Sequence, residues 1–149
     1  MTALKSFLSS KNFAGVKLRM TLTNHFEINA TINGVEGRFI LDTGASNTCI
    51  GMDKIDFFGL NFEPSEVKAA GAGATEMETL ISKNNTIQMG KWQKRRQQIV
   101  LFDLVHVNQA LVTHNARPVD GIIGADLLKK GKAIIDYSKK MLYLKIKSA

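Results

Sequence analysis

Apolar and polar residues alternate along much of the chain, and this period of two predicts β-strands. Four segments show the alternation clearly: residues 16–22, 26–32, 35–41 and 141–147. Asn33 and Gly34 separate the second segment from the third, and this pair favours the tight turn of a β-hairpin because both residues tolerate a positive φ. We therefore expect a mostly β chain with a hairpin closed at this turn.

A few segments depart from the alternation. Residues 97–102 hold a continuous apolar run that predicts a buried strand, whereas residues 104–113 carry apolar side chains at helical spacing. Residues 125–130 carry an acidic side chain, Asp126, in the first turn and two lysines in the last turn, as the helix macrodipole favours. We expect a second short helix there, ended by Gly131, and a turn at Asn84-Asn85.

Length and composition agree with one globular domain of 149 residues, 44% of them hydrophobic. No window approaches the roughly 18 consecutive apolar residues of a membrane span, and the first residues lack the pattern of a signal peptide. The single cysteine excludes an internal disulfide. We expect a cytoplasmic protein with no membrane association, divided into an N-terminal extension (residues 1–15) and one domain (residues 16–149).

Twenty lysines and arginines against 13 acidic residues give a net charge of +7, which raises nucleic-acid binding as a possibility. The densest basic run is KWQKRR, residues 91–96. No nucleic-acid-binding motif accompanies it, so we interpret the charge as a solvated surface and expect no nucleic-acid partner.

Asp42 is the residue that most needs an explanation. The sequence FILDTGAS places this carboxylate directly after the apolar end of a predicted strand, where an acid is costly unless it is hydrogen-bonded, paired or used. Gly44 lets the backbone turn sharply beside it. A carboxylate held in this way can act as a general base on water. One carboxylate alone does not supply the acid that amide hydrolysis also needs, whereas two carboxyls sharing a proton supply both.

Three segments together resemble the retropepsin-like (retroviral-type) aspartic proteases. LDTGAS, residues 41–46, resembles their active-site loop. DGIIGADLL, residues 120–128, resembles the segment that passes beneath that loop into a short helix. AAGAGATE, residues 69–76, is glycine-rich and lies where the family carries its flap. The resemblance extends over roughly residues 16–147, with the motif pair about 80 residues apart.

The resemblance implies a single-domain acid-protease β-barrel with a flap hairpin and one or two short helices. It further implies an aspartic endopeptidase that needs no metal or cofactor. Because the chain has one D-T-G, a working site would require a homodimer acting on an extended polypeptide, and the last strand, residues 141–147, would contribute to the dimer contact. The implied site residues are Asp42 as the catalytic residue, base in one subunit and acid in the other; Thr43, Gly44 and Ala45 in the active-site loop and dimer grip; Ala70, Gly71, Ala72 and Gly73 in the flap; and Ile122, Ile123 and Gly124 supporting the loop.

Other chemistries fit the sequence less well. Gly44-Ala45-Ser46-Asn47-Thr48 lacks the last glycine of a serine-hydrolase elbow. Cys49 lies in an apolar segment that predicts a buried thiol, and the three histidines show no metal-ligand spacing. The alternative that stays open is a protease-like fold without turnover, used for dimerisation or peptide binding.

Overall fold

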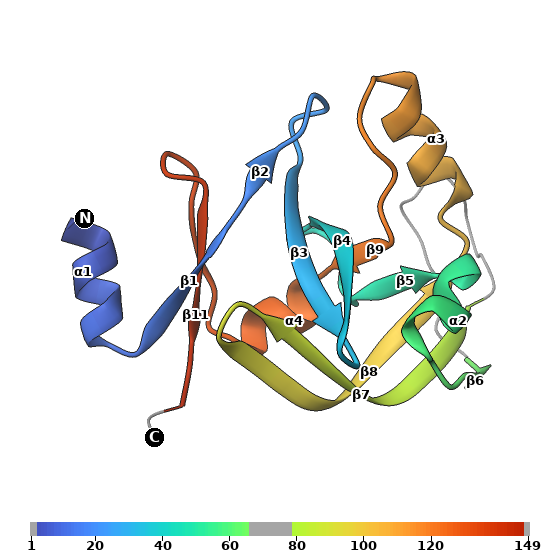
Figure 1. Cartoon of the computed structure of the whole chain (residues 1–149), viewed down its shortest axis with the longest axis horizontal. Coiled ribbons are helices and arrows are strands. Elements are labelled where there is room, and N and C mark those ends of the chain that lie inside the picture. Colours follow the sequence, from blue (N-terminus) through green and yellow to red (C-terminus); the bar gives the residue numbers. More distant parts are fainter. Residues whose placement is uncertain (1–2, 66–78, 148–149) are drawn as a thin grey trace.

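The computed structural model describes residues 3–65 and 79–147, and its strands form two sheets (Figure 1). The strands are β1 (Phe13–Lys17), β2 (Arg19–Met20), β3 (Phe26–Ile32), β4 (Val35–Leu41), β5 (Cys49–Gly51), β6 (Glu63–Pro64), β7 (Leu80–Met89), β8 (Trp92–Phe102), β9 (Gly121–Ile123), β10 (Ile134–Asp136) and β11 (Met141–Lys145). The helices are α1 (Ala3–Ser10), the 3-10 helix η1 (Met52–Lys54), α2 (Ile55–Phe58), α3 (Val105–Thr113) and α4 (Ala125–Lys130).

The larger sheet closes into a barrel. Its order is β2-β3-β4-β9-β5-β8-β7-β6, and β3 also pairs with β7. This extra pairing joins six strands into a ring, from β3 through β4, β9, β5, β8 and β7 back to β3. The mostly β barrel expected from the sequence is thus confirmed.

The hairpin of β3 and β4 forms as predicted. Asn33 and Gly34 adopt φ angles of 52° and 85°, and the strands pair from Ile32↔Val35 to Phe26↔Leu41. The Asn33 side chain also accepts a hydrogen bond from the Thr86 amide at 3.0 Å. The turn is therefore anchored to β7 at the place where the barrel closes.

Two apolar clusters lie on opposite faces of the same strands. The larger fills the barrel and includes Ile28, Phe39 and Leu41. The smaller lies on the outer side of the barrel and includes Ile40 from the same strand, together with Leu111 of α3. The alternation of the sequence is therefore used in full, because successive residues of β4 enter different clusters.

The single strand predicted over residues 16–22 is wrong. The chain leaves β1 of the smaller sheet and enters β2 of the larger one, with Leu18 buried between them. The Leu18 amide donates to the Lys140 carbonyl at 2.9 Å, whereas Leu22 is 76% exposed. The alternation is real, but its residues serve two different sheets, which a pattern within one segment does not reveal.

The turn predicted at Asn84-Asn85 is also wrong. Both residues lie inside β7, where the pairing with β8 shifts register on either side of Asn85. Asn84 takes a positive φ of 62°, and the buried Asn85 donates to the Ser82 hydroxyl at 3.0 Å. Asparagine tolerates this backbone conformation equally well in a turn or in a β-bulge, and here it forms a bulge.

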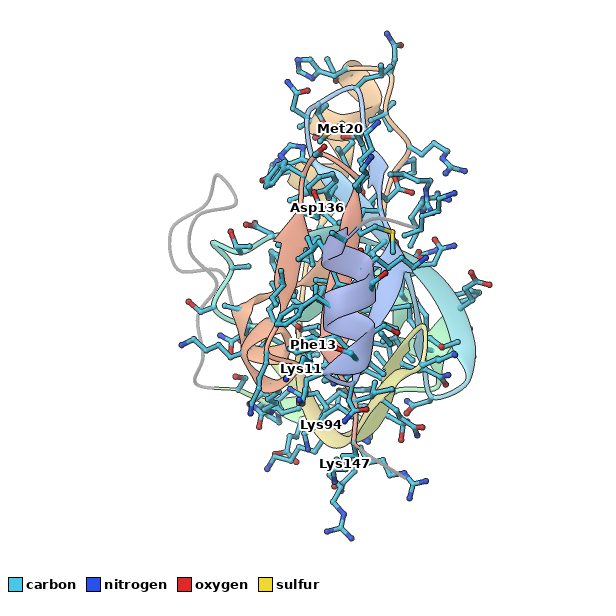
Figure 2. All side chains as sticks on the ribbon, turned by 90° about the vertical axis from the view of Figure 1, so that its left-hand side faces the viewer. Lys11, Phe13, Met20, Lys94, Asp136 and Lys147 are labelled. Carbon is cyan, nitrogen blue, oxygen red and sulfur yellow. The ribbon has the colours of Figure 1, made fainter. Side chains whose placement is uncertain are left out.

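The smaller sheet has the order β1-β11-β10 and carries α1 on its outer side, in front of the strands in Figure 2. The described residues thus contain four α-helices, more than the one or two expected, partly because α1 comes from the N-terminal extension. Leu8 of α1 is buried. The division at residue 16 stays a prediction, and residues 13–15 already lie within β1.

The expected contribution of residues 141–147 to the dimer contact stays a prediction, but pairing within the chain limits how this strand could make it. β11 is the central strand of its sheet, so both of its edges pair within the same chain. Leu142 and Leu144 are fully buried in the barrel core. Among residues 3–65 and 79–147, no further strand pairs with this sheet, so its outer edges belong to β1 and β10.

The basic run of residues 91–96 forms part of the β7–β8 hairpin. Trp92 is buried against Gly131, so its ring is not available to stack on a base. No helix within residues 3–65 and 79–147 is long and apolar enough to span a membrane. The flap predicted at Ala70, Gly71, Ala72 and Gly73 lies in residues 66–78, outside the described residues.

Candidate active site

The D-T-G loop starts where β4 meets β9. The two strands run parallel, with Leu41 paired to Ile123, and the Asp42 amide continues this ladder by donating to the Ile123 carbonyl at 3.0 Å. The Ala45 amide donates back to the Asp42 carbonyl at 3.2 Å. Asp42 is therefore held at its backbone by a barrel strand on one side and by its own turn on the other.

The carboxylate of Asp42 faces solvent in the single chain. Its Oδ1 accepts a hydrogen bond from the Gly44 amide at 2.9 Å. Thr43 and Gly44 are exposed beside it. Within residues 3–65 and 79–147, no lysine, arginine or histidine forms an ion pair with Asp42. Among the described residues the carboxylate is thus oriented without a charged partner, and its exposed side is open to another molecule.

The second motif lies directly beneath this loop. Ile122 and Ile123 are buried in the two apolar clusters, one on each face of β9. The Ala125 amide donates to the Ala45 carbonyl at 2.7 Å. A Cβ on Gly124 would lie 2.8 Å from that same carbonyl oxygen. Only glycine allows the two segments to approach so closely.

A polar network that the sequence did not predict fixes the far end of the loop. Asp126 Oδ1 accepts hydrogen bonds from the Thr48 amide at 2.9 Å and the Thr48 hydroxyl at 2.7 Å. The hydroxyl oxygen in turn accepts from the Gly124 amide at 3.0 Å. From the sequence, Asp126 was interpreted only as an acidic residue that suits the first turn of a helix. Its position two residues after Gly124 is the signal that could have indicated a role beside the D-T-G loop.

We expect Thr48→Val to destabilise the protein by about 1–3 kcal/mol, because it leaves the buried Gly124 amide without its acceptor while keeping the shape of the side chain. Chemical denaturation of the variant measures this loss. Thr31→Val is the matched control, since the Thr31 hydroxyl makes a single long hydrogen bond of 3.4 Å to Gln88. Equal stability of the two variants would contradict a supporting role for Thr48.

Cys49 is a buried core thiol, as the sequence indicated. It lies in the smaller apolar cluster on β5. Burial raises its pKa to about 12, so the reactive thiolate form is scarce at neutral pH. The geometry does not support a cysteine nucleophile.

Cys49 is consequently expected to resist thiol reagents in the native protein at pH 8 and to react fully in denaturant. Because Cys49 is the only cysteine, a chromogenic disulfide reagent reports on this single site. Rapid labelling of the native protein would contradict the buried, protonated thiol described above.

Comparison with known proteins identifies the same architecture. A family model described as aspartyl protease matches residues 28–127. The fold is similar to a retropepsin-like aspartic protease from Rickettsia conorii (21% identity, 89% of this chain and 90% of that chain, TM-score 0.57). It is also similar to the retroviral protease-like domain of Ddi1 from Leishmania major (17% identity, 85% and 90%, TM-score 0.57).

A third similar structure is EIAV protease, solved in complex with the inhibitor HBY-793 (16% identity, 74% of this chain and 90% of that chain, TM-score 0.53). No curated protein sequence matches the chain. At these identities the solved structures establish the fold, whereas the family model covers both the D-T-G loop and most of the supporting segment. The chain belongs to the aspartyl protease family, with a retropepsin-like fold.

Proposed function

We propose that the protein is an aspartic endopeptidase that works as a homodimer, with Asp42 of each subunit forming one catalytic dyad. The observation that carries the proposal is the exposed Asp42 in a D-T-G loop braced from below by Gly124 and Ala125. A structural turn would not need a second segment packed so tightly beneath it.

The need for two subunits follows from the chemistry. Two carboxyls close together share one proton, because like charges at short range do not both ionise. The ionised Asp42 takes a proton from water as its oxygen attacks the peptide carbonyl carbon. The protonated Asp42 of the other subunit gives its proton to the carbonyl oxygen. The tetrahedral diol then collapses: one of its hydroxyls gives its proton to the carboxylate that is now ionised, and the C=O bond re-forms. The C–N bond breaks, and the amine nitrogen takes a proton from the other carboxyl of the dyad.

Symmetry explains why one loop per chain is enough. A two-fold axis passing beside Asp42 brings the same loop from each subunit face to face. Thr43, Gly44 and Ala45 are then the residues at the axis, and Thr43 and Gly44 are already exposed in the single chain. The outer edges of β1 and β10 offer further pairing surface, since β11 is already paired on both sides.

The substrate in this proposal is an extended polypeptide. An extended chain can hydrogen-bond to strand-like backbone on both sides of the dyad. By resemblance, the flap at Ala70, Gly71, Ala72 and Gly73 would close over it, with Ile122, Ile123 and Gly124 keeping the loop in place beneath.

One experiment separates this proposal from its alternative, a protease-like module that dimerises or binds peptides without cleaving them. The purified protein is incubated with a complex peptide mixture at mildly acidic to neutral pH, and new termini are read by mass spectrometry. Defined new termini support the peptidase. A protein that dimerises and binds peptides yet leaves the mixture intact over the whole pH range would favour the module.

A further inference from the structure

Three arginines surround one buried carboxylate on the outer face of the barrel. Glu27 of β3 has a side chain that is only 5% exposed. Its Oε1 lies 3.0 Å from Arg19, 3.2 Å from Arg38 and 3.5 Å from Arg117. Among residues 3–65 and 79–147, Glu27 is the only carboxylate that forms an ion pair with any of these guanidinium groups.

The charges of this arginine cluster do not balance. Guanidinium groups stay protonated at any pH of interest, so three positive charges meet one negative charge. A single partner with good geometry already offsets much of the cost of burying a carboxylate. The cluster therefore carries about two positive charges beyond what Glu27 neutralises.

Each arginine is held to a different degree. Arg38 is the most enclosed, with its guanidinium also donating to the Pro118 carbonyl at 3.0 Å. Arg19 donates to the Asn29 side chain at 2.8 Å and keeps 44% of its side chain exposed. Arg117 makes the longest contact and is 64% exposed. Arg117 and Arg19 can thus meet an added anion without disrupting the buried part of the cluster.

The cluster lies on the same face of the sheet as Asp42. Leu41 points into the barrel core, whereas Ile40 belongs to the outer cluster, so alternation turns Arg38, Ile40 and Asp42 outward together. Glu27 is directly opposite Ile40 in the β3–β4 pairing. Its Cα is therefore diagonal to Asp42, at ~7–8 Å.

Arg38 precedes Asp42 by four residues, a separation of roughly 13 Å along a strand. An extended substrate advances by the same rise per residue. A side chain that reaches the cluster would thus be roughly two to four residues from the bond aligned with Asp42.

We propose that this arginine cluster binds an acidic side chain of the substrate and makes the enzyme prefer aspartate or glutamate about two to four residues from the scissile bond. The fork of a guanidinium matches a carboxylate in bidentate geometry, which favours an acid over a neutral amide. This inference rests on the proposed peptidase function. In the homodimer, two-fold symmetry puts one cluster on each side of the cleaved bond, so acids at matched positions on both sides would act together.

The test compares peptides that carry either glutamate or glutamine at each position around a mapped cleavage site. We expect the wild type to cleave the best glutamate peptide roughly three- to tenfold faster in kcat/KM than its glutamine partner. Arg117→Gln lowers this preference, because it leaves Arg19 as the more exposed of the two remaining arginines in the cluster. Arg95→Gln, which removes the same charge from an exposed position on β8, retains the preference. No preference in the wild type, or an unchanged preference in Arg117→Gln, would overturn the proposal.

A binding measurement keeps this test separate from the peptidase proposal itself. Fluorescent forms of the same peptide pairs are titrated into Asp42→Asn and into the double variant with Arg117→Gln. Tighter binding of the acidic peptide that depends on Arg117 supports the cluster even if the wild type cleaves nothing. Equal binding of both peptides, or no binding, counts against the cluster whether or not cleavage occurs.

Discussion

Asp42→Asn is expected to abolish peptide hydrolysis, with a loss of about 10⁴-fold or more in kcat. An amide takes no proton from water and gives none to the carbonyl oxygen, so both halves of the dyad lose their function. The side chain keeps its size, and its oxygen can still accept the hydrogen bond from the Gly44 amide. We therefore expect the variant to fold and to dimerise like the wild type, as measured by thermal unfolding and sedimentation.

Asp103→Asn is the matched control for this experiment. Asp103 is also exposed, and its Oδ1 accepts a hydrogen bond from the amide two residues later, Val105, at 2.9 Å. It thus repeats the local geometry of Asp42 at a place without the D-T-G loop. Full activity of Asp103→Asn beside an inactive Asp42→Asn ties the chemistry to Asp42. Substantial activity of a well-folded Asp42→Asn would remove this residue from the mechanism.

Gly124→Ala is expected to destabilise the protein by about 2–4 kcal/mol and to remove most of its activity. The added Cβ would lie 2.8 Å from the carbonyl oxygens of Ala45 and Asn47, which are backbone atoms of the active-site loop. Gly124 has φ −105° and ψ −175°, an extended conformation open to alanine. The loss of stability therefore comes from the steric clash and not from backbone strain. The loop that carries Asp42 must shift to relieve the clash. Denaturant unfolding and peptide cleavage by the same sample measure the two effects.

Gly131→Ala separates loop displacement from general overpacking. Its Cβ would meet the Leu144 Cδ2 atom at 2.6 Å and the Trp92 ring at 3.3 Å, which belong to side chains and not to the active-site loop. We expect a smaller stability loss, about 1–2 kcal/mol, with activity retained by the folded fraction. Equal loss of activity in both variants at matched stability would contradict a positioning role for Gly124.

Local pattern was enough to predict the elements that are defined by their own residues. The Asn33-Gly34 turn forms because the two φ angles it needs are intrinsic to these residue types. The helix after Gly124 and the helix near residues 104–113 also follow from short-range signals. The two motifs around Asp42 and Gly124 are each contiguous in sequence, so their resemblance to a known family is visible without the structure that brings them together.

Features that depend on distant partners could not be predicted in this way. Leu18 is buried because the chain changes sheets there, and nothing in its own segment marks the change. Gly131 ends α4 as predicted, but the positive φ at this helix end, 49°, belongs to Lys132. Glycine is needed at position 131 for another reason, because the Leu144 side chain approaches its backbone closely. The hydrogen bond between Thr48 and Asp126 could not be predicted either, because the two residues are 78 positions apart and meet only in the folded chain.

The central claim, a dyad shared between two subunits, is tested most directly by mixing the wild type with Asp42→Asn. Equal amounts are exchanged to random pairing at constant total concentration, and peptide cleavage is compared with the wild type alone. Only pairs of two wild-type subunits hold a complete dyad, so we predict about one quarter of the original activity. A value of about one half would mean that each subunit works by itself, and would contradict a dyad built from two chains.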